Sequence, residues 1–371
     1  MSERSSLHRE PPRQAHRLAV AIVLGIVCGL VTFWRTSHSL DEPGGDFWQH
    51  WAAARALLAG IDPYAALNPS TLRVAGDAST ALGHWYFYPL PSVLIGLPFV
   101  WLSPSAGAGA FIGLATVAFA YVITRQGLGP LAICLSAPFV FCLFSGQSTP
   151  AIVAAALVPA AQGLLALKPN VGMAMFAARP SRWAWVGGVL LVVVSLIVLP
   201  TWPREWLAAV ARSPFHHAPI AWWVGAPLLL LAGIKWRRPE ARLFVVFACI
   251  PQVPLFYDQL PLALVPSTDR ERLVFAWCSW AADLGWVYSS SHGQMRTADM
   301  RDAPPWILAL VYTPALFMLL RRTNTGQVPV WVERLAAHAP LWLRGTSTTL
   351  RAEDPVAREI QPLDYGLSQG R

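Results

Sequence analysis

The sequence predicts an all-α integral membrane protein, a polytopic helical bundle of about ten crossings with an amphipathic interfacial outer loop. First, 55% of the 371 residues are hydrophobic and only 13% are charged, against about 25% charged in soluble domains. Second, the hydrophobic residues form long runs that a soluble protein would expose to water. Third, the net charge of +8 comes from basic residues between those runs, as in cytoplasmic loops. The apolar content also excludes a disordered chain.

The first crossing follows a basic N-terminal segment, residues 1–17, which we expect in the cytoplasm. The apolar run 18–34 is long for a signal peptide, and no cleavage site of small residues follows it. We therefore expect an uncleaved signal anchor with the N-terminus inside.

The later crossings are short, and several have fewer than the ~20 residues that a span usually needs. The runs lie at about 106–124, 128–144, 150–166, 184–200, 221–234, 243–257, 273–288 and 305–320, with a further crossing at about 259–268. The stretch 150–178 must cross an odd number of times. One long crossing is the simplest reading, and three short ones would bring Lys168 near the outer surface.

The positions of the basic residues fix the direction of each crossing. The run 90–102 fits this pattern as an amphipathic helix in the outer interface, within an outer loop of residues 35–105. Most basic residues then face the cytoplasm. After the first crossing they are Arg125, Arg179, Arg182, Lys235, Arg237, Arg238, Arg242, Arg270, Arg272, Arg321 and Arg322. The prediction is a transmembrane domain at 18–322, a cytoplasmic, largely disordered tail at 323–371, and both termini inside.

The outer loop contains a conspicuous acid, Asp46, which follows two glycines and precedes an amphipathic helix of about residues 47–59. An Asp at this position either caps the helix or presents its carboxylate at the rim of the bilayer. On this helix we expect these residues to face lipid: Phe47, Trp48, Trp51, Leu57 and Leu58.

Other polar side chains interrupt the apolar runs near the predicted outer face. They occur in residues 84–99, 145–148, 167–170 and 256–259. Each group alone is typical of a helix cap or an interfacial belt. If the helices bundle, these groups converge with Asp46.

The order of these short motifs resembles a known family. The chain has an Asp before AARALLAG and DPY, then FYPLP, GQS, LALKP and YDQ. This order, over residues 18–268, is similar to the polyprenol-phosphate-mannose-dependent mannosyltransferases of glycosyltransferase family 87, which are membrane enzymes of the GT-C type. The resemblance implies transfer of mannose from a polyprenyl phosphate to a glycolipid or glycan at the outer face of the plasma (inner) membrane, with Asp46 as the catalytic base.

The chemistry of such a transfer indicates which other residues to consider. A departing phosphate anion favours a nearby cation, and the candidates are Arg55, Lys168, Arg204, Arg212, His216 and His217. The predicted substrate-binding set is Arg55, Tyr64, His84, Tyr88, Gln147, Lys168, His216, His217, Tyr257 and Asp258. We expect no metal, because adjacent histidines without a carboxylate make a poor site. Nor do we expect a cofactor or a nucleic-acid partner. The expected partners are the lipid-linked donor, the acceptor and membrane lipid.

Two alternatives remain at this stage. A polyprenyl-phosphate arabinofuranose would suit the same architecture. A non-enzymatic flippase or scaffold is the other, and it would favour charged residues within the membrane. The sequence has one clear case, Asp283, inside the run 273–288.

Overall fold

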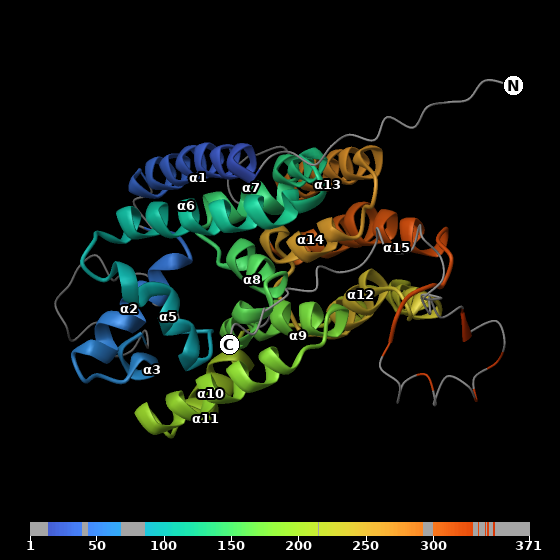
Figure 1. Cartoon of the computed structure of the whole chain (residues 1–371). Helices are drawn as coiled ribbons and strands as arrows, with labels where there is room; N and C mark the ends of the chain where they lie inside the picture. Colours follow the sequence, from blue (N-terminus) through green and yellow to red (C-terminus); the bar gives the residue numbers. More distant parts are fainter. Residues whose placement is uncertain are drawn as a thin grey trace, which may run out of the picture.

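A computed structural model describes residues 14–38, 44–67, 86–213, 215–291 and 300–328, and the single residues Glu333, His338, Pro340, Arg344 and Gly345. The described residues form a helical bundle without strands (Figure 1). They include an isolated β-bridge between His217 and Gln252. The predicted all-α class is therefore confirmed.

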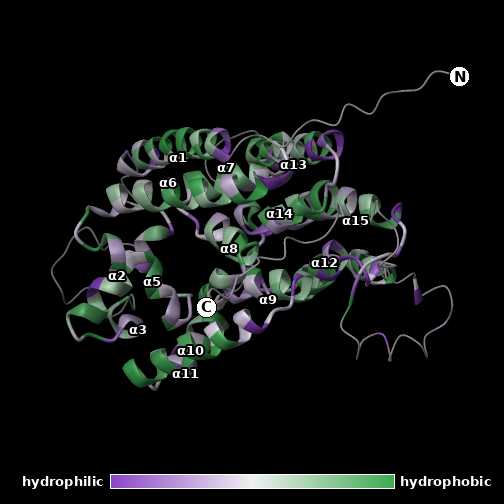
Figure 2. Cartoon of the chain, in the orientation of Figure 1, coloured by the Kyte–Doolittle hydropathy of each residue, from purple (hydrophilic) through white to green (hydrophobic). Residues whose placement is uncertain are grey.

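Three helical segments are long and apolar enough to cross a membrane, by length and composition. They are α1 (Gln14–Ser37), α6 (Pro104–Ile123) with η4 (Thr124–Gln126), and the segment Met300–Leu320, made of η10 (Met300–Asp302), α14 (Ala303–Ile307), η11 (Leu308–Tyr312) and α15 (Thr313–Leu320). A fourth candidate is bent by 100° between α10 (Arg182–Val198) and α11 (Trp202–Ala211). Hydrophobic colouring dominates these elements in Figure 2. The other expected crossings fall in shorter or more polar helices.

Close packing of glycines joins α1 to α6. Gly25 and Gly29 on α1 face Gly113 and Gly109 on α6, so the two helices run antiparallel. A Cβ atom added to Gly29 would lie 2.7 Å from the carbonyl oxygen of Gly109. Small residues spaced by four are the usual means of close helix contact in membranes.

The stretch 150–178 folds as three short elements instead of one long helix. These are α8 (Thr149–Ala156), η6 (Pro159–Leu167) and α9 (Pro169–Ala178). At one end of α8, Lys168 donates to Thr149 at 2.9 Å; beyond its other end, Arg125 donates to the carbonyl of Leu157 at 3.2 Å. An eight-residue α-helix spans only about 12 Å. Lys168 therefore lies at a turn inside the bundle and not at the end of a complete crossing.

A second interrupted pair follows the same pattern. The expected crossings 243–257 and 259–268 are instead α12 (Pro239–Cys249) and η9 (Phe256–Leu264), joined by an irregular segment at 250–255. Proline residues lie in this segment and within η9. Such breaks are tolerated at membrane depth where the backbone is buried in protein or lines a cavity.

The basic residues expected in the cytoplasm gather at one end of the bundle, here called the basic end. Arg242 donates to the carbonyls of Ala177 and Ala178, and Arg322 donates to the carbonyl of Val265. Part of the expected disordered tail is docked there, since Glu333 accepts from both terminal nitrogens of Arg237.

The opposite end carries the segment expected to be the outer loop, for which that name is kept, and its helices have a hydrophobic core of their own. They are α2 (Phe47–Leu58), α3 (Pro63–Ala66), η2 (Leu90–Ser92), α5 (Val93–Gly96) and η3 (Leu97–Phe99), and α11 covers them. The run 90–102, expected to be one amphipathic helix, is three short helices. At its end, Trp101 is 89% exposed, as expected of an interfacial residue. Phe47, expected to face lipid, is fully buried because Gly107 leaves room for its ring. On the same helix, Leu58 is exposed as expected, and Trp48, Trp51 and Leu57 are half-buried.

The remaining elements complete the bundle around this frame. They are η5 (Gly129–Leu135), α7 (Ala137–Phe144), η7 (Pro219–Ala221), η8 (Ala226–Lys235) and α13 (Asp269–Ser291). Asp283 is half-buried on α13.

Candidate functional site

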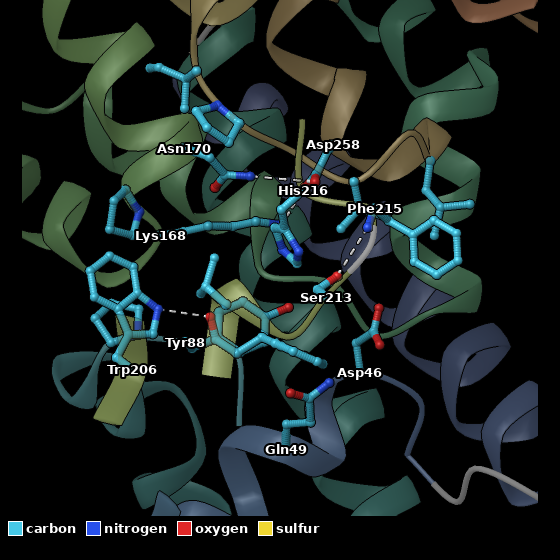
Figure 3. A pocket seen from close by; sticks show the side chains of 18 of the residues that line it. Asp46, Gln49, Tyr88, Lys168, Asn170, Trp206, Ser213, Phe215, His216 and Asp258 are labelled. Atoms are coloured by element: carbon cyan, nitrogen blue, oxygen red, sulfur yellow. Dashed lines mark hydrogen bonds and ion pairs between the residues drawn. The ribbon is translucent and has the colours of Figure 1, made fainter. Parts of the chain in front are cut away.

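A cavity of about 690 Å³ lies between the outer-loop helices and the interrupted helices of the bundle (Figure 3). Its lining comes from α2, α9, α11 and the irregular segment before η9. The wall is mixed. Its polar residues include Asp46, Lys168, Asn170 and Asp258, and its apolar residues include Met173, Leu207, Val210, Ile250, Val253 and Leu255. A cavity of this kind suits a ligand with both a polar and a hydrocarbon part.

Asp46 reaches the cavity through a turn that needs glycine. Gly44 and Gly45 have φ angles of +92° and +57°, and a Cβ atom on Gly45 would lie 2.7 Å from the carbonyl oxygen of Ser145. The Asp46 N–H donates to that same carbonyl at 2.7 Å. The Asp46 side chain makes no capping bond to the described residues of α2; its carboxylate accepts a short hydrogen bond from the Gln147 amide. The carboxylate is therefore held by the site, and helix capping does not explain it.

Gln147 lies in the sharp turn between α7 and α8, where Gly146 has a φ of +64°. Its amide nitrogen donates to Asp46 and, at 3.3 Å, to the hydroxyl of Tyr88. Its amide oxygen accepts from the Lys168 ammonium at 2.7 Å. The reversed amide would place its oxygen against a carboxylate and its nitrogen against an ammonium. The network therefore fixes which way Gln147 points.

Lys168 is 3% exposed and lies between η6 and α9. Its ammonium contacts three acceptors: Gln147 Oε1 at 2.7 Å, Thr149 Oγ1 at 2.9 Å and Asp258 Oδ1 at 2.8 Å. The first two contacts are hydrogen bonds and the third is a buried ion pair, so the protein already engages this cation on three sides. The other oxygen of Asp258 accepts from the Asn170 amide at 3.4 Å. Asp46, Gln147, Lys168, Asp258 and Asn170 thus form a continuous chain of polar contacts, called here the polar chain.

Aromatic rings cover the polar chain on the side of the outer loop. The ring of Tyr88 lies 4.2 Å from that of His50, and Tyr64 donates to the Tyr88 carbonyl at 2.8 Å. Burial raises the pKa of Tyr88 well above its usual value, and the charges of Asp46 and Asp258 add to this, so the phenol stays protonated. Burial, and then the charge of Lys168, lower the pKa of His50 to about 3. His50 is therefore neutral near pH 7.

Two basic residues, Arg212 and His216, line the cavity on the segment after α11. Arg212 is exposed and His216 is half-buried. Burial lowers the pKa of His216, and the negative charge of Asp258 opposes this shift. The permanent positive charge on this wall is therefore that of Arg212.

The structure brings together most of the predicted site residues and separates the others. Asp46, Tyr88, Lys168, His216, Tyr257 and Asp258 line the cavity, and Gln147 bonds to three residues of this group. Tyr64 lies behind Tyr88 in the core of the outer loop. Arg55 is exposed and stacks on Trp51 instead of facing the cavity, Arg204 and His217 are exposed, and His84 lies outside the described residues.

The sequence did not single out the lining residues Gln49 and Ser213, and it indicated Asn170 only as part of the polar group 167–170. Gln49 is three residues after Asp46 on α2, the spacing of one helical turn, so helical periodicity could have identified it. Asn170 follows Lys168 and Pro169 directly in the chain. Its proximity in sequence to a buried lysine was the available signal.

Comparison with protein-family models, with curated proteins and with solved structures finds no match.

Proposed function

We propose that the chain is a membrane glycosyltransferase that moves a mannosyl residue from a polyprenyl phosphate to a hydroxyl of a glycolipid or glycan. The observation that carries the proposal is the polar chain, whose two carboxylates line one cavity next to hydrocarbon side chains. A lipid-linked sugar has the matching composition, a polar head on an apolar chain. The family resemblance of the motifs supports the same substrate class.

The proposed reaction is a single displacement with inversion. The acceptor oxygen attacks the anomeric carbon, its proton passes to the Asp46 carboxylate, and the bond from the anomeric carbon to the phosphate oxygen breaks. The electron pair leaves with the polyprenyl phosphate. A base in hydrogen-bond reach of the attacking hydroxyl typically contributes about 10²–10⁴-fold.

Arg212 and His216 are the groups we assign to the departing phosphate. They line the cavity, and the Arg212 guanidinium has the fork of donors that suits phosphate. Tyr257 and Tyr88 would contact the sugar, since both line the same cavity.

The proposed orientation puts the cavity on the outer face of the plasma (inner) membrane and the basic end in the cytoplasm. It rests on the positive-inside rule, since the basic end gathers the residues that rule assigns to the cytoplasm. If the stretch 150–178 crosses an odd number of times in total, whether once or three times, the direction of every later element is unchanged. With about ten crossings or with two more, both termini stay inside.

A polyprenyl-phosphate arabinofuranose is the alternative donor, because the polar chain alone does not choose between two sugars. A flippase is the alternative of another class. The one intramembrane acid that favoured it, Asp283, lies on α13 and the cavity is formed by other elements.

The test is transfer by the purified full-length protein in detergent or nanodiscs. Synthetic polyprenyl-phosphate mannose would be the donor, with octyl α-mannoside and a mannosylated glycolipid as acceptors, without nucleotide or divalent metal. We expect a mannosylated product. Product from the arabinofuranosyl donor alone would select the alternative sugar. Product from GDP-mannose in a system unable to make the lipid donor would contradict the proposal, as would lipid translocation without transfer.

A further inference from the structure

The buried Lys168 is the cation of the polar chain, and the sequence made it one of six candidates for the departing phosphate. The geometry points to a different role. We propose that Lys168, held by Asp258, is a positioning residue that fixes the Gln147 amide against Asp46, and that Arg212 supplies the charge for the phosphate. The inference rests on the proposed function, because it takes Asp46 as the base.

The Lys168 ammonium is already engaged by the protein. It donates hydrogen bonds to Gln147 at 2.7 Å and Thr149 at 2.9 Å, and it forms an ion pair with Asp258 at 2.8 Å. A phosphate oxygen would have to displace one of them, and the side chains of Lys168 and Asp258 are each only 4% exposed. Breaking a buried ion pair is strongly unfavourable. A ligand phosphate would bind more readily to Arg212, whose side chain is exposed at the cavity wall.

The ammonium also fixes the orientation of Gln147. Only the amide oxygen can accept from Lys168, so the amide nitrogen must point the other way, towards Asp46 and Tyr88. The nitrogen has two N–H groups and two acceptors, the Asp46 carboxylate and the Tyr88 hydroxyl. One buried cation thus sets the orientation of the amide that binds the Asp46 carboxylate.

The members of this relay lie at short breaks between helices or, for Asp258, in a short 3₁₀ helix. Gln147 follows Gly146, whose φ of +64° favours glycine, and Lys168 is fixed between η6 and Pro169. Asp258 lies in η9 next to the aromatic ring of Tyr257, and Lys168 lies 5.4 Å from the centre of that ring. Catalytic groups held by supporting contacts of this kind keep the narrow geometry that proton transfer requires.

The test separates turnover from donor binding. In the transfer assay above, Lys168→Met and Gln147→Leu should each lower kcat about tenfold to a hundredfold, with the donor KM changed by less than about threefold. Combining them should cost little beyond either single change, because both break one relay. Arg212→Gln should instead raise the donor KM. Gln162→Leu, a buried glutamine on η6 that bonds to the Ala156 carbonyl, is the control and should retain kcat.

A paired variant covers the case in which Lys168→Met alone does not fold. Lys168→Met with Asp258→Leu removes both charges together, and proteins often tolerate replacement of a buried ion pair by apolar residues. We expect it to recover thermal stability but not kcat, because Gln147 has still lost its donor. Recovery of both would reduce the pair to a structural role and overturn the inference. A raised donor KM with normal kcat in Lys168→Met would also overturn it and leave the proposed function standing. Absence of transfer by the unmodified protein would contradict the proposed function itself.

Discussion

Replacing Asp46 by asparagine tests the central residue of the proposed site with little structural disturbance. The Asp46 side chain makes no capping bond to the described residues of α2, so the helix start loses no such contact. The backbone bond from residue 46 to the Ser145 carbonyl is independent of the side chain. An asparagine oxygen can still accept from Gln147, whose orientation Lys168 determines. We therefore expect the melting temperature to stay within a few degrees.

The expected change is in turnover. Asparagine cannot accept the proton of the attacking hydroxyl, so kcat should fall by about 10²–10⁴-fold, with little change in donor KM. Asp62→Asn is the matched control, because Asp62 is also in the outer loop. It caps α3 by accepting from the Tyr64 N–H at 2.8 Å, which asparagine does equally well. The assay is transfer of radiolabelled mannose, with melting followed by intrinsic fluorescence. Normal turnover by a folded Asp46→Asn protein would refute the assignment of the base.

Two further predictions concern orientation and acid stability. The orientation can be tested with single cysteines in a background without the five native ones. A cysteine at exposed Arg204 should react with an impermeant thiol reagent added to intact cells, whereas a cysteine at exposed Arg270 should not. Labelling of position 270 alone would show that the topology is the reverse of the proposed one. The pKa of His50 is about 3 in the folded protein and about 6.5 when unfolded, so the unfolded state binds the proton first and stability should fall as the pH drops below about 6.5. His50→Gln should show a smaller fall in melting temperature between pH 7 and pH 4.5, and equal slopes in the two proteins would contradict this explanation.

The members of the polar chain could be predicted from the sequence because they interrupt apolar runs. A charged or amide side chain in such a context must be paired, hydrogen-bonded or solvated, and glycine or proline beside it marks a turn. Gln147 and Lys168 satisfy both conditions. The pairing between them could not be predicted, since it depends on how three short elements fold back on one another. For this reason Lys168 was one of six candidate cations for the phosphate, although in the structure it bonds to Gln147 and Thr149 and pairs with Asp258.

Hydropathy failed to indicate that the site lies inside the bundle, at turns between interrupted helices. Runs such as 150–166 and 243–257 contain few polar residues, so they resemble single crossings although they hold turns. Two local glycine patterns indicated helix contacts that hydropathy averaged over a run did not. The spacing of Gly25 and Gly29 on α1 matches that of Gly109 and Gly113 on α6, a pattern of close helix contact. Gly107 leaves the space into which Phe47 packs. The hydrophobic periodicity of α2 alone had predicted that Phe47 faces lipid.

The interrupted helices and the buried charges have one physical explanation. A backbone that leaves the helical conformation inside an apolar bundle exposes N–H and C=O groups that need partners or a cavity. A buried Lys168–Asp258 pair is no more stabilising than well-packed hydrocarbon of the same volume. Stability alone therefore favours neither feature. Both occur at the same place, beside a cavity that also contains Asp46. This coincidence is what a site for a charged, lipid-linked substrate requires, because such a substrate needs polar groups held rigidly where the surrounding medium supplies none.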